Sequence, residues 1–157
     1  MMVLLLRHAE RPLNSNDDVL TEAGHERATL LARMLKDSGV SLACRSQYVR
    51  ARQTLEPLKQ ARGDALVVQE FSVGNTPEQI EAHVQQVVQA VKSQHDDAVI
   101  VVVGHTNTVP LIIKELGGGA IGQILDQEFD KLFVVSTNSI EPESKGTLLK
   151  LRYGAVS

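Results

Sequence analysis

The chain has 157 residues, a formal net charge of −3 and a hydrophobic content of 43%, enough to bury a core without disulfides or metals. We therefore expect a single domain over residues 1–157. Aromatic residues make up only 3%, so a nucleic-acid-binding protein, which needs a basic face or stacking platforms, is not indicated. The N-terminal apolar run is short and no later stretch could span a bilayer. We expect a cytoplasmic protein that binds no membrane, of unknown oligomeric state.

Six short runs rich in Val, Ile and Leu predict strands. In chain order they cover residues 3–6, 40–44, 65–68, 98–103, 132–135 and 148–151. The single cysteine, Cys44, lies in the second run, where we expect a small buried hydrophobic side chain.

Segments of helical period alternate with these strands. They cover residues 21–36, 48–61, 77–93 and 108–116, with a short helical piece expected near 121–127. The third start is well marked, with Thr76 as N-cap, Pro77 in the first helical position and Gln79 three residues after the cap. The alternation predicts an α/β fold, a three-layer sandwich with a mostly parallel central sheet of about six strands.

The glycines between Gly117 and Gly122 match the GxGxxG string of dinucleotide-binding proteins. That fingerprint needs a strand before it and a helix after it, whereas this string follows a predicted helix. We therefore interpret the glycines as a helix C-cap and loop, and we expect no nucleotide cofactor.

Side chains that can bind an anion follow four of the predicted strands. The segments are "LLLRHAE", "ACRSQYVRARQT", "VVQEFSVG" and "VVVGHTNT". Each alone is better explained by solvated strand ends and helix faces. In a parallel sheet, however, the carboxyl ends of the strands lie along one edge, where ligands collect. The side chains that we expect to converge there are Arg7, His8, Ser46, Arg50, Glu70 and His105.

Such a convergence suits a phosphoryl group. Two guanidinium groups and an imidazole match its oxygens, and helix starts after Ser46 and Thr106 would add backbone N–H donors. Nearby guanidinium charge disfavours a further cation, so the imidazole of His8 stays neutral with a free lone pair. His8 is therefore the expected nucleophile.

Four blocks of sequence carry a resemblance to a known family. They are "RHAE" followed by Asn14, "LTEAGHERA", "RSQYVRARQT" and "VVVGHTNTVP". In order and spacing they resemble the histidine phosphatase superfamily, also called the phosphoglycerate mutase-like family, and the match runs nearly end to end. The resemblance implies the small single-domain phosphatase branch.

In that family the residue matching His8 becomes phosphorylated, and the residues matching Arg7, Arg50 and His105 hold the phosphate with help from Asn14. The resemblance implies a hydrolase of phosphomonoesters that works through a covalent phosphohistidine and needs no metal or other cofactor. Its substrate would be a phosphorylated small molecule or a phosphoprotein. A phosphoglycerate mutase and a phosphate-binding scaffold without turnover are the alternatives.

The sequence departs from the family pattern at two positions. Ala9 stands where the family usually has glycine, and Gln47 replaces the proline of the usual Ser-Pro pair. The family's general acid is commonly a glutamate followed by glycine four residues on, a spacing that Glu70 and Gly74 fit. The stretch "EFSVGNTPEQI" also resembles small phosphohistidine phosphatases, in which an acid is not always needed.

Three further histidines have no such setting. His25, His83 and His95 lie among polar neighbours, so we expect each to be a solvated surface residue. No pair of His or Cys residues has the spacing of zinc ligands, and we expect no metal site.

Overall fold

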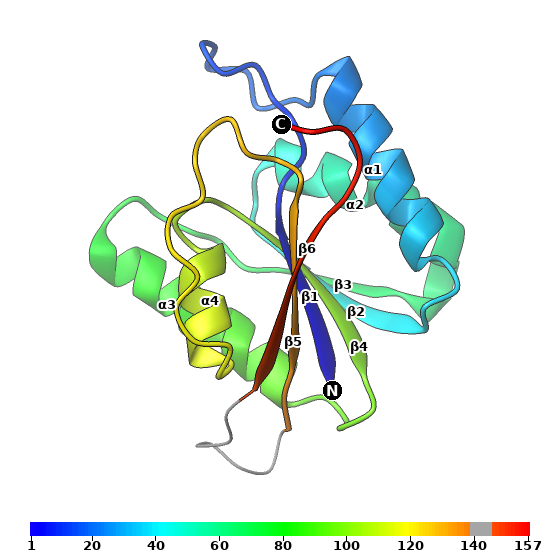
Figure 1. Ribbon diagram of the computed structural model, residues 1–157, viewed down its shortest axis with the longest axis vertical. Helices are drawn as coiled ribbons and strands as arrows, with labels where there is room; N and C mark the ends of the chain where they lie inside the picture. The colour runs from blue at the N-terminus through cyan, green and yellow to red at the C-terminus, as the bar shows by residue number, and fades with distance from the viewer. Residues whose placement is uncertain (139–145) are drawn as a thin grey trace.

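The computed structural model describes residues 1–138 and 146–157, and these form a six-stranded sheet in the order β3-β2-β4-β1-β5-β6 (Figure 1). The strands are β1 (Met2–Arg7), β2 (Val40–Arg45), β3 (Val67–Glu70), β4 (Val99–Gly104), β5 (Lys131–Ser136) and β6 (Thr147–Arg152). Strands β3, β2, β4 and β1 run parallel, and β5 is antiparallel to both of its neighbours. The predicted mostly parallel sheet is confirmed.

Helices cover both faces of the sheet. They are α1 (Glu22–Leu35), α2 (Val49–Arg62), α3 (Pro77–Lys92) and α4 (Val109–Glu115), with a short 3₁₀ turn, η1 (Gly63–Ala65). In Figure 1, α1 and α2 lie on one side of the sheet and α3 and α4 on the other. None of the helices in the described ranges is long and apolar enough to cross a membrane.

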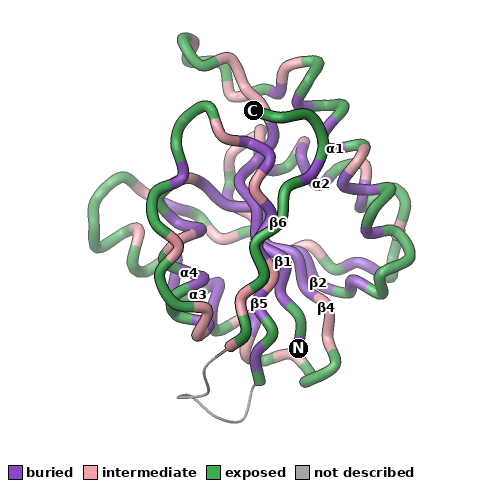
Figure 2. The backbone as a smooth tube through the Cα atoms, in the orientation of Figure 1, coloured by how far each residue is buried: buried purple, intermediate pink, exposed green. Residues whose placement is uncertain are grey.

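The two faces of the central strands build two separate cores. Along β1, Val3 and Leu5 pack with α3 and α4, whereas Leu4 and Leu6 pack with α1 and α2. Side chains alternate between the faces of a strand, so a strand covered on both sides must be apolar throughout. Figure 2 shows the result, with the central strands buried and the outer surfaces of the helices exposed.

The helical piece expected near residues 121–127 is wrong, because the chain there is irregular. Gly119 and Gly122 adopt φ values of 76° and 78°, a left-handed conformation that interrupts a right-handed helix. The C-cap interpretation of the glycines is in accord with the structure, since Gly117 has φ 84° just after α4 and the N–H of Gly118 donates to the carbonyl of Ile113.

The functional edge of the sheet lies where β1 and β4 pair. Their register sets Arg7 opposite Gly104, at the last residues of both strands. The chain leaving β1 leads to α1 on one face, and the chain leaving β4 leads to α4 on the other. Connections that diverge from adjacent parallel strands open a crevice at the carboxyl ends, where α/β proteins bind ligands.

Helix α1 holds the chain that leaves β1. The carbonyl of Glu10 accepts a hydrogen bond from the N–H of Thr21 at 2.9 Å, and its carboxylate pairs with the buried Arg27 at 2.7 Å. Gly24 permits this close approach, since a Cβ there would lie 2.3 Å from the carbonyl oxygen of Glu10. The position therefore requires glycine.

We predict that Gly24→Ala destabilises the fold. The added methyl group forces α1 away from Glu10, and overpacking of this kind costs about 1–3 kcal/mol. Urea denaturation measures the change, with Glu26→Ala on the exposed side of α1 as the control. Equal stability of the Gly24→Ala variant and the parent would show that the contact between α1 and Glu10 is loose.

Candidate active site

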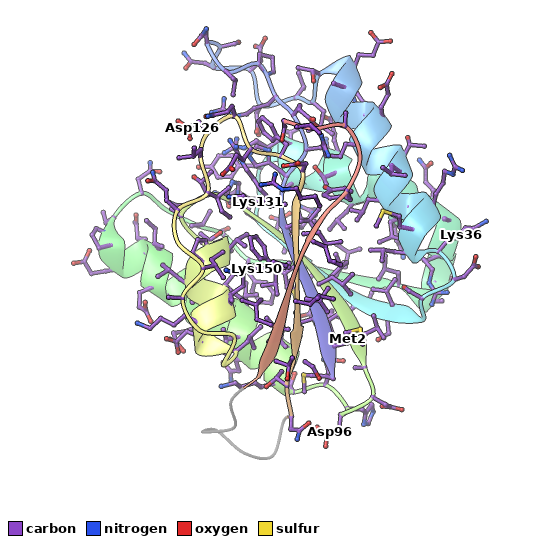
Figure 3. The ribbon with its side chains drawn as sticks, in the orientation of Figure 1. Met2, Lys36, Asp96, Asp126, Lys131 and Lys150 are labelled. Carbon is purple, nitrogen blue, oxygen red and sulfur yellow. The ribbon has the colours of Figure 1, made fainter. Side chains whose placement is uncertain are left out.

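A cavity of about 230 Å³ lies at the carboxyl ends of β1 and β4. Its lining comes from every segment that follows a parallel strand, together with the loop before β5. The lining residues are Arg7, His8 and Arg11 after β1, Tyr48 and Arg50 after β2, residues 73–75 after β3, residues 105–107 after β4, and Asp126. In Figure 3, Asp126 lies at the end of the molecule opposite to Met2, where β1 begins.

His8 lies in this cavity as a neutral base. Its side chain is almost fully buried, and Nδ1 lies 2.8 Å from the carbonyl oxygen of Ala9. A carbonyl oxygen only accepts, so we assign the proton to Nδ1 and the lone pair to Nε2. Burial lowers the pKa of His8 to about 2, and the charges of His105, Arg7 and Arg50 act in the same direction.

His105 lies beside His8, with 5.3 Å between the two ring centroids. Its Nε2 forms a hydrogen bond of 2.7 Å with the hydroxyl of Ser46. Burial lowers the pKa of His105 to about 3, with the positive charge of Arg50 as the next cause. Both imidazoles are therefore neutral near pH 7.

Two arginines are held in place around the histidines. Nη1 of Arg7 donates to the backbone carbonyls of Leu125, Asp126 and Glu128, and its guanidinium lies 4.1 Å from the ring centroid of Phe129. Burial lowers the pKa of Arg7 to about 10, which still leaves it charged.

The second of these arginines is held by an acidic residue and an aromatic ring. Nη1 of Arg50 pairs with the carboxylate of Asp18 at 2.5 Å, and its guanidinium lies 4.0 Å from the ring centroid of Tyr48. Each arginine is thus fixed before any ligand binds.

Three guanidinium groups retain an unused donor. The Nε atoms of Arg7, Arg11 and Arg50 are buried and have no hydrogen-bond partner among the described residues. All three arginines line the same cavity, so their guanidinium groups concentrate positive charge and N–H donors around it. The acceptor that fits several guanidinium groups at once is an oxyanion.

Most of the side chains expected to converge do so. Arg7, His8, Arg50 and His105 line the cavity, and Ser46 contacts His105. Their convergence follows from the strand order and register described above.

Glu70 and Asn14 are not brought to the cavity. Glu70 lies on the outermost strand, directly opposite Arg45, and the two side chains pair at 2.7 Å. Opposite charges facing each other on adjacent strands attract, and the half-exposed carboxylate of Glu70 pairs with Arg45 and does not line the cavity. Asn14 is exposed in the loop after β1. The roles expected for these two residues stay predictions without support from their positions.

The expectation of a solvated surface position is wrong for His83. Its side chain is only 3% exposed, because it faces inward from α3, close to the backbone of Ser72 and Phe71. Burial lowers its pKa. His25 and His95 are exposed, as expected.

Arg11 and Asp18 are among the residues at the site that sequence reasoning missed. Arg11 follows His8 by three residues, and that proximity was the available signal. Asp18 has no such signal, because it reaches α2 across the fold, where Oδ2 accepts from the N–H of Val49 at 2.7 Å. It thereby supplies the cap that Tyr48 lacks.

No three His, Cys, Asp or Glu side chains within residues 1–138 and 146–157 are grouped to hold a metal ion. The lone thiol, Cys44, is buried in β2 as expected, and burial raises its pKa to about 12. The cavity itself is lined by donors that suit an anion.

Comparison with known proteins agrees with this fold. Residues 3–72 match the histidine phosphatase superfamily (branch 1), a span that includes His8, Arg50 and the strands β1 to β3. No curated protein sequence matches the chain significantly.

Solved structures extend the similarity over the whole chain. The protein histidine phosphatase SixA, complexed with tungstate, is 24% identical, with 97% of both chains covered and a TM-score of 0.67. A protein from Escherichia coli, provisionally assigned as an alpha-ribazole-5′-P phosphatase, is 18% identical over 100% of this chain and 99% of its own, with a TM-score of 0.73. A mycobacterial glucosyl-3-phosphoglycerate phosphatase is 18% identical over 99% of both chains, with a TM-score of 0.65.

At these identities the likeness to the solved structures is one of fold. The chain has the fold of the phosphoglycerate mutase-like phosphatases. The resemblance to the histidine phosphatase superfamily is confirmed by the matched residues and by these neighbours.

We predict that stability falls steeply in mild acid. Burial lowers the pKa of His8, His83 and His105 below the usual 6.5, so below pH 6.5 the unfolded chain binds more protons than the folded one. The free energy of unfolding is therefore at its full value above pH 6.5. Below that pH it declines by up to about 1.4 kcal/mol per pH unit for each histidine.

Urea denaturation at pH 7.5 and pH 5.5 measures this effect. His83→Gln should reduce the difference between the two pH values, while His25→Gln, at an exposed position, should leave it unchanged. A urea midpoint that is the same at both pH values would show that these histidines are not buried as neutral groups.

Proposed function

We propose that this protein is a phosphatase that hydrolyses phosphomonoesters through a covalent phosphohistidine at His8. One observation carries the proposal: a neutral imidazole with a free Nε2 lone pair shares a cavity with the guanidinium groups of Arg7, Arg11 and Arg50. A phosphoryl group supplies both oxygens that suit guanidinium donors and an electrophilic phosphorus for the imidazole.

The reaction has two displacement steps. Nε2 of His8 attacks phosphorus, a P–N bond forms, and the bond to the leaving oxygen breaks with its electron pair on that oxygen. The ring then carries a positive charge, which the carbonyl of Ala9 stabilises by accepting from Nδ1–H. Water attacks the phosphorus next, the P–N bond breaks, and its electron pair returns to Nε2. The protons of that water pass to inorganic phosphate or to solvent.

The arginines stabilise the charge on the transferring group. Arg7 and Arg50 present guanidinium groups that are already oriented by backbone carbonyls and by Asp18, so little reorganisation accompanies the reaction. His105 is oriented by Ser46 and stabilises the phosphoryl oxygens in the tautomer that presents a ring N–H to them.

The position of Glu70 favours substrates with good leaving groups. A carboxylate that pairs with Arg45 outside the cavity is poorly placed to protonate a leaving oxygen. The imidazole of a phosphohistidine and the phenolate of an aryl phosphate are leaving groups that depart without strong acid assistance. The similarity of fold to SixA, a protein histidine phosphatase, supports a substrate of this class. The substrate is accordingly a phosphorylated small molecule or a phosphoprotein.

We predict that His8 carries the phosphoryl group during turnover. Brief mixing with p-nitrophenyl phosphate, followed by denaturation without acid, should leave an acid-labile phosphate on His8 that mass spectrometry locates. His8→Ala should slow phosphate release at least about a thousandfold, because the attacking group is lost.

The exposed His25 provides the matched control, and His25→Ala should leave the rate unchanged. Turnover of the His8→Ala variant within tenfold of the parent would exclude His8 as the nucleophile. Interconversion of 2-phosphoglycerate and 3-phosphoglycerate that outpaces phosphate release would instead indicate a mutase.

We further predict that Glu70→Gln affects alkyl and aryl phosphates alike, with each rate within about threefold of the parent. A true general acid would matter far more for the poor alkyl leaving group. Steady-state rates with an alkyl phosphate and with p-nitrophenyl phosphate measure the comparison. A selective loss of alkyl phosphate hydrolysis would restore the proton-donor role expected for Glu70 from its spacing.

A further inference from the structure

One wall of the cavity follows an edge strand of the sheet. Residues 73–75 line the cavity and follow β3, the outermost strand, which pairs only with β2. The main-chain pairing of β2 with β3 reaches Arg45 and Glu70 and ends with the N–H of Phe71 donating to the carbonyl of Arg45 at 2.9 Å. The wall begins where this pairing stops.

The side chain of Gln47 continues the pairing. Its Nε2 donates to the carbonyl of Val73, and its Oε1 accepts from the N–H of Val73, both at 2.9 Å. The primary amide thus makes the two hydrogen bonds that a neighbouring strand would make. The family's proline at this position has no side-chain donor or acceptor, so it could not form them.

Gln47 lies between two residues that touch the phosphate-binding groups. Ser46 contacts His105, and the ring of Tyr48 stacks against the guanidinium of Arg50. The amide of Gln47 therefore ties the wall directly to the segment that carries these groups.

The wall has further supports beyond Val73. Oε1 of Gln79 accepts from the N–H groups of Asn75 and Thr76 at 3.0 and 3.2 Å. These contacts fix the far end of the loop to α3. The side chain of Gln47 fixes the middle of this loop, at Val73, to the turn between β2 and α2.

We propose, on the basis of the phosphatase function proposed above, that Gln47 is a positioning residue that sets the distance between the phosphate-binding groups and the wall at residues 73–75. It does not line the cavity and touches no substrate. Its amide determines how the group attached to the phosphoryl group is held, and so which substrates fit. The phosphoryl group itself contacts arginines and histidines that Gln47 leaves in place.

Two ligands with the same anionic head separate these effects without any need for turnover. Inorganic phosphate reaches only the phosphate-binding groups, whereas phenylphosphonate also extends its ring toward the wall. Calorimetry on Gln47→Leu should show phenylphosphonate binding weakened about tenfold, because two modest hydrogen bonds are lost. Binding of inorganic phosphate should change less than twofold.

A titratable variant distinguishes a positioning role of Gln47 from a general role in folding, because only the positioning role makes ligand binding depend on pH through this side chain. In Gln47→Glu the introduced carboxylate cannot donate to the carbonyl of Val73, but its protonated form donates and accepts as the amide does. At each pH we compare the dissociation constant for phenylphosphonate of the variant with that of the parent. The variant should bind about tenfold more weakly at pH 7.5, and this difference should shrink as the pH falls to 5. Gln69→Glu, on the same edge strand but away from the cavity, is the control and should show no such trend.

Equal weakening of phosphate and phenylphosphonate in Gln47→Leu would overturn the proposal, as would unchanged binding of both. Absence of phosphonate binding by the parent would also overturn it. A wrong assignment of the phosphatase function gives a different result. The parent would then release no phosphate, while the two ligands would still bind with the selectivity described.

Discussion

The parallel pairing of β1 with β4 is the constraint on which the site depends. It sets Arg7 opposite Gly104, and the N–H of His8 donates to the carbonyl of Gly104 at 3.0 Å. The two imidazoles that follow these strands are therefore brought side by side, with 5.3 Å between centroids. Because the two connections leave to opposite faces, a crevice opens at the strand ends. The cavity is a consequence of topology, and its chemistry is a consequence of which residues come next.

Electrostatics then decides what the histidines do. Burial and the guanidinium charges keep His8 and His105 neutral, which costs stability in acid but preserves a nucleophilic lone pair. Backbone carbonyls orient the guanidinium of Arg7, and Asp18 orients that of Arg50. Cations and neutral bases are thereby concentrated in one small cavity, an arrangement that an oxyanion stabilises.

Local pattern predicted the strands, the four helices and the four cavity residues Arg7, His8, Arg50 and His105, because periodicity and strand-end position are encoded within short segments. It failed where tertiary contacts decide. Glu70 pairs across β2 and β3 with Arg45, His83 turns inward beneath a loop, and Asp18 reaches a helix start 31 residues away. Residues 121–127 have an apolar pattern that favours a helix, yet glycines in the left-handed conformation interrupt it.

The central claim is that the cavity holds His8 as a neutral imidazole with the proton on Nδ1 and the lone pair on Nε2. Nitrogen-15 NMR of histidine-labelled protein tests it most directly, with His8→Gln used to assign the signals. The account predicts that the two ring nitrogens of His8 keep the shifts of a neutral Nδ1–H tautomer from pH 8 down to pH 5.5. A His8 that becomes protonated in this range, or that carries its proton on Nε2, would contradict the account.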